Sequence, residues 1–399
     1  SGLAPAVATA PAGARTPAER LLVAHLDARV TNPRVAGLAG VVADDSGRHV
    51  WSRRRLAPVM PASTVKIVTA MTVLDALGAG ATISTPAYLT PGGRVILVGA
   101  GDPMLDQARL RALARAAADA VRAARPTTPT PVVSVGFDDS LFAPPTRPTG
   151  WPAGYWPTVG APVRPLVVDG RDSLDTAADA ARVFARLLAE AGLQVSGTPR
   201  RMPPASWPEG TVQVGSVASA PVGAMVTHML SVSDNDVAEG LLRLAAVRTG
   251  RPGTWAGGRA AQLATLHRYA VPTDGVRLYD GSGLSRSDRL TAQALVRLLR
   301  VASTQPAFAP TFAQGMPVAG VSGSLRPARS RFVTAPSSCA AGRLVAKTGT
   351  LTGSEALAGW TLREGAPDRY FAFVVTGRPT SLPGKRALDG LAATVTGCW

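Results

Sequence analysis

The sequence is poor in the residue types that build metal sites. Its 399 residues include two cysteines and four histidines, and the histidines are scattered without an HExxH pattern. A protein metal site needs several such ligands at short spacing, so we expect no bound metal. No apolar run reaches the length that crosses a membrane.

The two cysteines, Cys339 and Cys398, are either free thiols or one disulfide that pins the C-terminus. The chain starts with Ser1 and Gly2 rather than methionine. Residues 1–16 are rich in Ala, Pro and Gly, which resembles what is left after a signal peptide is removed. We therefore expect an exported protein of the cell envelope. We favour the disulfide, because such bonds persist in oxidising compartments.

Acidic residues and lysines are also scarce. The chain has 26 Asp and Glu against 42 Lys and Arg, a formal net charge of +16, and its only lysines are Lys66, Lys347 and Lys385. This charge favours an anionic partner, such as nucleic acid, a membrane surface or an acidic polymer. The arginines form no long basic run and no nucleic-acid-binding motif. We therefore expect no nucleic acid, and we retain an anionic cell-wall or membrane surface as a partner.

Apolar residues, at 46%, are plentiful, and the length suits two domains or one large domain with an insertion. Hydrophobic periodicity and capping signals predict helices at 17–30, 63–77, 222–230, 236–248, 259–269, 291–302 and 384–395, and strands at 36–43, 49–52, 343–350, 356–362 and 370–376. The last three strands follow one another too closely for helical crossovers, so their sheet should be mainly antiparallel. We expect an α+β fold in which one sheet, built from both chain ends, carries helices on each face.

Residues 81–210 differ in character from the rest of the chain. They are rich in Pro and Gly, with short β-like runs at 94–98 and 132–136 and with Ala- and Arg-rich helices at 105–124 and 173–191. We interpret 81–210 as an inserted domain within a discontinuous catalytic domain made of 17–80 and 211–399.

Three short motifs carry the candidate chemistry, and the first is Ser63-Thr64-Val65-Lys66 at a helix start. A serine becomes a nucleophile when a base removes its proton. Residues three apart share a helix face, so Lys66 can reach Ser63, and the helix N-terminus favours negative charge there. Lys66 can be the base only if its pKa is lowered, by burial or by a cation such as Lys347. Taken alone, the motif is more often a solvated helix face.

The second motif is Ser233-Asp234-Asn235, between two expected helices. Ser233 can relay a proton to a leaving amine, and Asn235 can hold a substrate amide. All three residue types also favour helix starts, so this motif alone is better explained as a cap.

The third motif is Lys347-Thr348-Gly349-Thr350 on a β-like run. An exposed strand edge can pair with an extended peptide, and Gly349 would let that peptide approach closely. The ammonium of Lys347 and the two threonine hydroxyls suit a terminal carboxylate. The alternative is an ordinary strand end followed by a turn.

The conjunction of the three motifs decides between these interpretations. They occur in order, each in the element that its chemistry needs, and two of the three lysines lie in them. Lysines scattered at random over the basic positions would fill both motif positions about one time in three hundred. We therefore interpret the catalytic set as Ser63, Lys66, Ser233, Asn235 and Lys347.

Together, SxxK, SDN and KTG resemble the motifs of the penicillin-binding protein and serine β-lactamase superfamily. Five stretches resemble its class C low-molecular-mass members more closely: PASTVK at 61–66, GDPML at 101–105, DDSLF at 138–142, DGSGLSR at 280–286 and AKTGTL at 346–351. These relatives are D-Ala-D-Ala carboxypeptidases and endopeptidases with an insertion between the first two motifs. The resemblance covers about residues 20–395, and the short insertion implies that the nested third domain of larger members is absent or reduced here.

The resemblance implies a penicillin-binding, serine β-lactamase-like fold that acts on peptidoglycan stem peptides, is acylated by β-lactams and needs no cofactor. Ser63 attacks the penultimate D-Ala carbonyl, Lys66 is the base, and Ser233 passes a proton to the departing D-Ala. The backbone N–H groups of Ser63 and Thr350 form the oxyanion hole, which is usually the largest catalytic contribution.

The resemblance also implies how the substrate is bound. Lys347, Thr348 and Thr350 bind its terminal carboxylate. A pocket for the side chain of the stem peptide is expected from Arg331 and Thr352, together with Asp138 or Asp139.

Two other functions stay open. A serine β-lactamase shares the acylation step but needs a deacylating base, which the sequence does not identify. A non-catalytic cell-wall binding protein of the same fold is disfavoured by the intact Ser63, Lys66 and Lys347.

Overall fold

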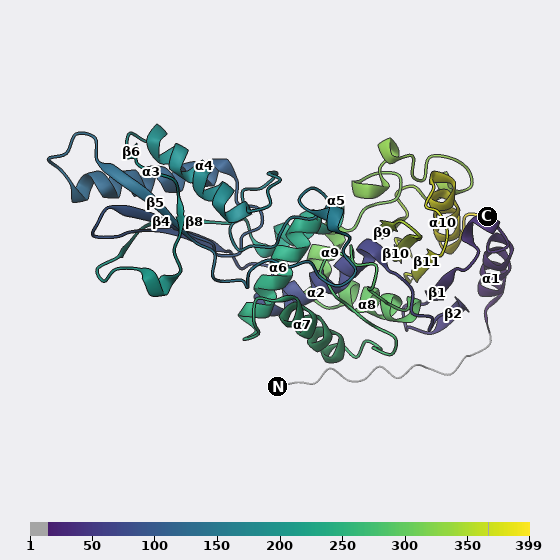
Figure 1. Cartoon of the computed structure of the whole chain (residues 1–399). Coiled ribbons are helices and arrows are strands. Elements are labelled where there is room, and N and C mark those ends of the chain that lie inside the picture. The colour runs from purple at the N-terminus through teal and green to yellow at the C-terminus, as the bar shows by residue number, and fades with distance from the viewer. Residues whose placement is uncertain (1–14, 366) are drawn as a thin grey trace.

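The computed structural model describes residues 15–365 and 367–399, so residues 1–14 of the Ala-, Pro- and Gly-rich opening stretch lie outside the described residues. The described chain is elongated and has two lobes (Figure 1). The larger lobe carries helices α1 (Pro17–Arg29) and α10 (Leu382–Val395), which come from opposite ends of the sequence.

The larger lobe is built on an antiparallel five-stranded sheet with the order β2-β1-β11-β10-β9. Its strands are β1 (Ala39–Ala43), β2 (His49–Arg53), β9 (Leu344–Leu351), β10 (Ser354–Thr361) and β11 (Tyr370–Thr376). Because β1 pairs with β11, the two ends of the chain meet in the middle of the sheet. The expected sheet is therefore confirmed, and it has β9 at one edge.

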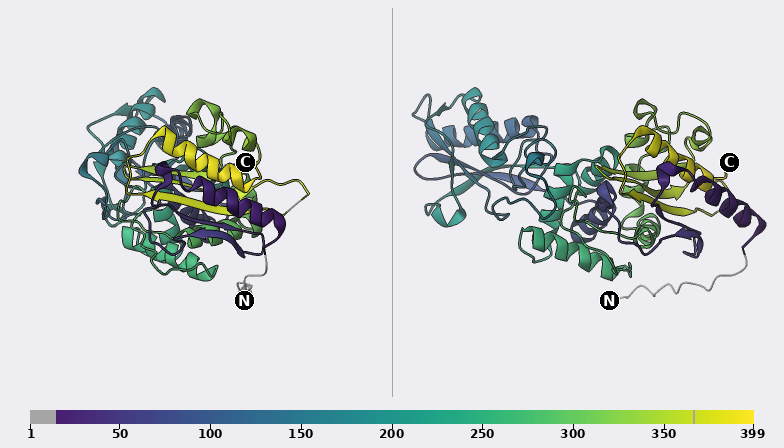
Figure 2. Two further views of the ribbon diagram at one scale, coloured as in Figure 1. Left: turned by 90° about the vertical axis from the view of Figure 1, so that its right-hand side faces the viewer. Right: turned by 45° about the vertical axis from the view of Figure 1, so that its right-hand side comes forward.

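Helices α1 and α10 lie side by side on one face of this sheet (Figure 2). Their apolar sides meet the sheet in one buried cluster, in which Leu26 and Leu388 pack with Phe371 and Phe373. Burial of these side chains is the main driving force that holds this layer in place.

The other face of the sheet carries a group of helices: α2 (Val65–Leu77), α5 (Val222–Val232), α6 (Asn235–Arg248), α7 (Trp255–Arg268), α8 (Ala292–Thr304) and α9 (Ala309–Gly315). Helix α8 contacts β1 and β11, and α2 contacts α5, α6, α7 and α8. Ten of the thirteen residues of α2 are buried, as expected for a helix with neighbours on all sides. Within the described part of the chain, none of the helices is long and apolar enough to span a membrane.

The smaller lobe has its own sheet, with the order β6-β5-β4-β3-β8 and with β7 paired to β5. Its strands are β3 (Ser84–Leu89), β4 (Arg94–Val98), β5 (Val132–Asp138), β6 (Gln194–Val195), β7 (Arg200–Arg201) and β8 (Val212–Ala218). Helices α3 (Gln107–Ala124) and α4 (Thr176–Glu190) pack on this sheet in a separate core. The division at 80 and 210 stays a prediction, and the pairing of β8 with β3 favours a second boundary after Ala218.

Cys339 and Cys398 form a disulfide, as favoured from the sequence. The bond ties the short 3-10 helix Ser337–Ala340, which precedes β9, to the end of the chain.

Candidate active site

Ser63 lies in a 3-10 turn, Ala62–Thr64, that continues into α2. The preceding Ala62 has a left-handed backbone with φ of 49°, a conformation that non-glycine residues hold only when their surroundings enforce it. Gly283 forms part of those surroundings. A Cβ there would lie 2.0 Å from the Ala62 carbonyl oxygen, so only glycine permits this close contact beside the nucleophile.

Lys66 is fully buried one turn after Ser63. Its Nζ lies 3.2 Å from Ser63 Oγ and donates to Asn235 Oδ1 and to the Ser282 carbonyl oxygen, each at 2.8 Å. These three acceptors match the three N–H donors of an ammonium group. When the amine loses a proton, its lone pair is therefore next to the serine hydroxyl.

Burial lowers the pKa of Lys66 to about 8, although the nearby carboxylates of Glu239 and Asp280 act in the opposite direction. Burial also holds the pKa of Lys347 well below its usual value, and the charge of Lys66 adds to this effect. Of the two causes considered from the sequence, burial is the one that lowers the pKa of Lys66, and the repulsion between the two amines lowers the pKa of Lys347.

Lys347 joins the second and third motifs. Its buried Nζ donates to Ser233 Oγ at 2.8 Å and to the Thr348 carbonyl oxygen at 3.0 Å. Ser233 ends α5 in the left-handed region, with φ of 66°, and this backbone turn directs its hydroxyl to the lysine. A proton path from Lys347 to Ser233 is therefore in place.

The middle residue of the second motif does serve as a helix cap. Asp234 accepts a hydrogen bond from the backbone N–H of Val237 at 3.0 Å, at the start of α6. Its other carboxylate oxygen contacts His228 Nε2 at 3.2 Å. Asp234 is therefore the helix cap, whereas Ser233 and Asn235 of the same motif contact the two lysines.

Asn235 is engaged within the protein through both of its polar side-chain atoms. Its Oδ1 accepts from Lys66 and its Nδ2 donates to the Val159 carbonyl oxygen at 2.8 Å. Val159 lies in the segment that connects β5 and α4. Asn235 thus orients Lys66 in this structure, and its expected contact with a substrate amide stays a prediction.

The edge of β9 is covered over its first half and open over its second. The N–H of Ala346 donates outward to the Pro317 carbonyl oxygen at 2.9 Å, where residues 317–319 pair with the strand. Backbone groups alternate along a strand, so the N–H groups of Thr348 and Thr350 also point outward. This is the direction that the expected oxyanion hole needs.

Gly349 has a packing role that the sequence did not indicate. A Cβ at this position would lie 2.8 Å from the Pro61 carbonyl oxygen and 3.2 Å from the Ala62 side chain. The glycine therefore lets β9 pack against the segment that carries the nucleophile. The expected close approach of a substrate peptide at Gly349 stays a prediction.

An open groove of about 460 Å³ passes over the nucleophile and the open strand edge. Its lining is polar and basic, without an acidic residue: Ser63, Val232, Ser233, Ser324, Arg329, Arg331, Thr348, Thr350, Leu382 and Lys385. Ser324 Oγ lies 2.8 Å from Thr348 Oγ1 and fixes that hydroxyl. All three lysines of the chain thus lie in or beneath the site, although the motifs account for only two of them.

The residues predicted to bind the stem-peptide side chain lie in varied surroundings. Arg331 lines the groove, but its guanidinium is buried and pairs with Asp389, with Nε 2.8 Å from Oδ2. Thr352 is exposed in the turn after β9 and is not among the groove residues.

The two acidic candidates lie at the end of β5. Asp139 forms ion pairs with Arg164 at 2.6 Å and with Arg201 at 2.9 Å, and Asp138 accepts the backbone N–H of Ser140 at 2.9 Å. Recognition of a side chain by any of these residues stays a prediction.

Glu239 is a supporting residue that the motifs did not reveal. Its buried carboxylate accepts the N–H of Gly281 at 2.9 Å and of Ser282 at 2.7 Å, which directs the Ser282 carbonyl toward Lys66. Burial raises the pKa of Glu239 to about 8. Because Glu239 follows Asn235 by one helical turn, its position on the same face of α6 was the available signal.

A buried lysine beside a serine at a helix start, a second lysine–serine pair and an open strand edge define a serine hydrolase of the penicillin-binding type. The chain matches the D-Ala-D-Ala carboxypeptidase 3 (S13) family at residues 22–174 and 170–395, and it belongs to that family. It is a serine-type D-Ala-D-Ala carboxypeptidase.

Relatives and solved structures agree with this assignment. The chain is 33% identical over 420 residues to carboxypeptidase DacB of Mycolicibacterium smegmatis, covering 99% of this chain and 88% of that protein. It is 35% identical over 410 residues to a carboxypeptidase of Mycobacterium tuberculosis, covering 96% and 86%. Penicillin-binding protein 4 of Haemophilus influenzae has the same fold, with a TM-score of 0.76 at 18% identity over 92% of this chain and 97% of that one.

Proposed function

We propose that Ser63 is the nucleophile with which this carboxypeptidase removes the terminal D-Ala of peptidoglycan stem peptides, and that the same site cleaves peptide cross-links as an endopeptidase. The observation that supports this best is the 3.2 Å contact between Ser63 Oγ and the fully buried Lys66 Nζ. A serine next to a lysine of lowered pKa is the arrangement that nucleophilic catalysis requires.

In the proposed reaction, neutral Lys66 takes the proton of Ser63 as Oγ attacks the penultimate D-Ala carbonyl carbon. The developing oxyanion receives hydrogen bonds from the backbone N–H groups of Ser63 and Thr350. The C–N bond then breaks, and Ser233 passes a proton to the departing amine and is reprotonated from the lysines. Water hydrolyses the ester and restores Ser63.

We assign the substrate carboxylate to a different set of groups from the one implied by the resemblance. The Lys347 amine is buried and already donates to two acceptors, so it is poorly placed to balance an exposed negative charge. Arg329 and Lys385 line the same groove as Thr350. Within the described residues neither cation has an ion-pair partner, which favours them as carboxylate ligands.

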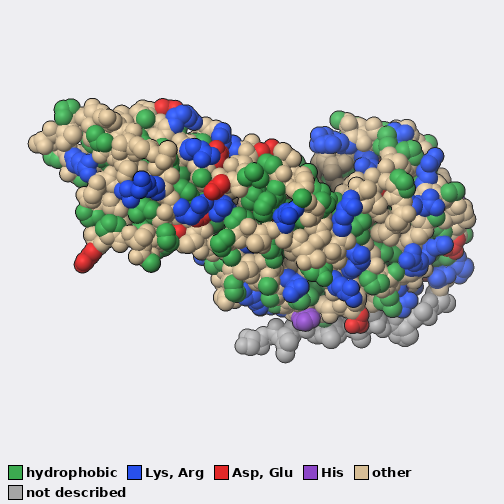
Figure 3. Space-filling view, viewed as in Figure 1, with side chains coloured by type: hydrophobic (Ala, Val, Ile, Leu, Met, Phe, Trp, Pro, Cys, Tyr) green, Lys and Arg blue, Asp and Glu red, His purple; other side chains and the backbone are tan. Residues whose placement is uncertain are grey.

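β-Lactams should acylate Ser63 and remain attached, because they imitate the substrate amide. A relative of the same fold, penicillin-binding protein 4 of Haemophilus influenzae, has been solved as a complex with a β-lactam. We also place the enzyme outside the cytoplasm, in the cell envelope, which its disulfide favours. Basic side chains are dispersed over the face in Figure 3, and docking of this surface on an anionic wall or membrane stays a prediction.

The decisive experiment is intact-protein mass spectrometry after exposure to benzylpenicillin. One covalent adduct is expected on the native chain and none on Ser63→Ala. Release of D-Ala from a stem pentapeptide should be lost in the same variant. Rapid nitrocefin turnover would instead favour the β-lactamase alternative, and absence of any adduct would favour a non-catalytic binding protein.

A further inference from the structure

A second pocket lies across α10 from the active-site groove. Leu382 and Lys385 of this helix line the groove, whereas Pro383, Arg386 and Gly390 line the pocket. Its opposite wall is the end of α1 and the loop that follows it. The two helices lie side by side on the outer face of the sheet (Figure 2). No residue that lines the pocket also lines the active-site groove.

Three arginines converge on this pocket from different parts of the chain. They are Arg29 at the end of α1, Arg34 in the 3-10 turn Pro33–Val35, and Arg386 on α10. Its twelve lining residues include no Asp or Glu. Such a concentration of one charge is unfavourable unless something of opposite charge is bound.

Of the three arginines, Arg29 gives the strongest evidence for a bound anion. Its Nε is buried and has no hydrogen-bond partner among residues 15–365 and 367–399, and its guanidinium forms no ion pair there. Burial lowers the pKa of Arg29, which reflects the cost of holding this cation away from water. The helix C-terminus stabilises a cation in the last turn but does not satisfy a buried donor.

Within the described residues, no carboxylate forms an ion pair with Arg29. Its Nη1 lies against α10, because a Cβ at Gly390 would be in ordinary contact with it at 3.5 Å. Two carboxylates near in sequence have other partners. Asp27 accepts from Trp51 Nε1 at 2.8 Å, and Asp389 is paired with Arg331 while also attracting Arg386.

We propose that this pocket binds a phosphate group. Three guanidinium groups offer planar pairs of donors, and a phosphate offers several acceptor oxygens and enough negative charge to balance more than one arginine. The phosphate belongs either to an anionic wall polymer or to a phospholipid head group. Either source would give the anionic partner expected from the net charge of +16 a defined place on the molecule.

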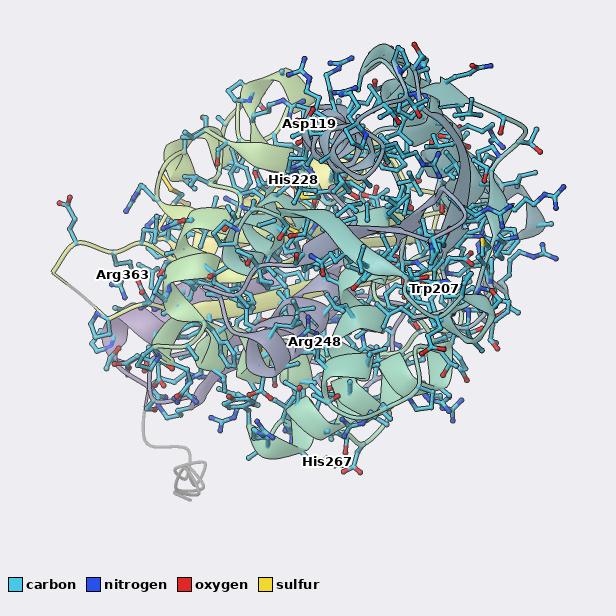
Figure 4. The ribbon with its side chains drawn as sticks, turned by 90° about the vertical axis from the view of Figure 1, so that its left-hand side faces the viewer. Asp119, Trp207, His228, Arg248, His267 and Arg363 are labelled. Carbon is cyan, nitrogen blue, oxygen red and sulfur yellow. A yellow bond between two sulfur atoms is a disulfide. The ribbon has the colours of Figure 1, made fainter. Side chains whose placement is uncertain are left out.

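The first test measures the thermal unfolding midpoint with inorganic phosphate against sodium chloride of equal ionic strength. Phosphate should raise the midpoint of the native chain, and Arg29→Gln should reduce the phosphate affinity at least tenfold. Without phosphate, Arg29→Gln should unfold at the native temperature or above it, because a partly buried cation without an ion-pair partner has been removed. The matched control is Arg248→Gln, which removes an exposed last-turn arginine of α6 and should keep the native response (Figure 4).

The proposal is overturned if phosphate and chloride act alike on the native chain, or if Arg29→Gln is destabilised without phosphate while keeping its phosphate affinity. Arg386→Gln gives a second test that does not depend on α1, and it too should weaken binding. Soluble polyglycerol phosphate and phosphatidylglycerol vesicles then distinguish the two sources. Benzylpenicillin labelling should persist in every variant, so failure here is separate from failure of the Ser63 assignment.

Discussion

Lys66 and Lys347 lie in the same buried site, but their neighbours differ. Lys66 donates to an amide oxygen and a backbone carbonyl and is close to the carboxylate of Glu239. Lys347 donates to the hydroxyl of Ser233 and a backbone carbonyl, with Lys66 as its nearby charge. Burial lowers the pKa of Lys66 to about 8 and the nearby carboxylates oppose this shift, whereas burial and the charge of Lys66 both lower the pKa of Lys347.

This difference predicts how acylation depends on pH. Lys66 must be neutral to accept the Ser63 proton, and its pKa of about 8 lies below the ordinary lysine value. The second-order rate constant for benzylpenicillin should therefore rise with pH and level off above about pH 8. Rapid-quench mass spectrometry between about pH 5.5 and 9.5, a range that brackets this pKa, measures the rate constant. A flat profile would remove Lys66 from the role of base.

Replacing Glu239 by Gln tests whether Glu239 helps to position Lys66 and to set its pKa. Each carboxylate oxygen accepts one backbone N–H, from Gly281 and from Ser282, and an amide can keep only one of these bonds. The expected loss of folding stability is about 1–3 kcal/mol, the usual cost of a buried unsatisfied donor. The pH midpoint of acylation should fall slightly as well, because Glu239, with a pKa of about 8, is partly ionised at that midpoint and its charge raises the pKa of Lys66.

The control for this variant is Glu209→Gln, at an exposed residue, for which neither quantity should change. Urea unfolding and the pH profile of acylation measure the two effects independently. An unchanged acylation midpoint in Glu239→Gln would show that Glu239 has no influence on the proton of Lys66.

The motif residues could be predicted from the sequence because spacing along a helix or strand places them directly. Ser63 and Lys66 share a helix face, and Lys347 alternates with its threonines on β9. Arg329 and Lys385 could not be found this way. They reach the groove only because α10 and the 327–329 turn fold against the sheet, and no local pattern encodes that approach.

At the scale of elements, the helices and strands with strong periodicity were predicted closely. The strand expected at 94–98 is β4 (Arg94–Val98), and the helix expected at 17–30 is α1, capped by Thr16. Strand β3 was missed because it contains Pro86, which normally argues against a strand. Strand β8 was missed because its residues are mostly exposed and lack a buried apolar face.

The close contact between the Gly283 loop and the Ser63 turn gives a prediction at this scale. Gly283→Ala places a Cβ against the Ala62 carbonyl, which must move. Because Ser63 follows Ala62 directly, its hydroxyl is then displaced relative to Lys66. A displacement of about 1 Å commonly costs on the order of a hundredfold in rate, so acylation by benzylpenicillin should fall by about that factor. Stopped-flow competition with a fluorescent penicillin measures the rate.

Gly78→Ala is the matched control, because both glycines have φ of 81° but nothing lies within 4 Å of a Cβ at Gly78. Both variants place a Cβ at a positive φ, which costs on the order of 1–3 kcal/mol. Equal acylation rates in the two variants would mean that strain, rather than displacement of the nucleophile, explains the loss.

At the scale of the whole molecule, the site depends on segments far apart in the sequence. Ser63, Ser233 and Thr348 line one groove, and the middle of the chain forms the separate lobe. Composition indicated an inserted unit, and the motifs indicated three converging segments. The relation between the lobes, including the Val159 contact to Asn235, depends on tertiary packing that composition does not encode.

Removing the disulfide tests how much the link between the segment before β9 and the chain end contributes to the free energy of unfolding. It joins Cys339 to Cys398, which are 59 residues apart, and the enclosed segment includes β9, β10, β11 and α10. Replacing both cysteines by serine frees this segment in the unfolded chain, which should lower the free energy of unfolding by about 2–4 kcal/mol.

Acylation of Ser63 at low temperature should be unchanged in the disulfide-free variant, because the bond lies outside the groove. Urea unfolding followed by tryptophan fluorescence gives the stability, and reduction of the native chain should reproduce the shift. The native urea midpoint in the variant would mean that α10 packing alone fixes the chain end. Lost acylation in a folded variant would instead mean that the bond positions β9 and its Lys347.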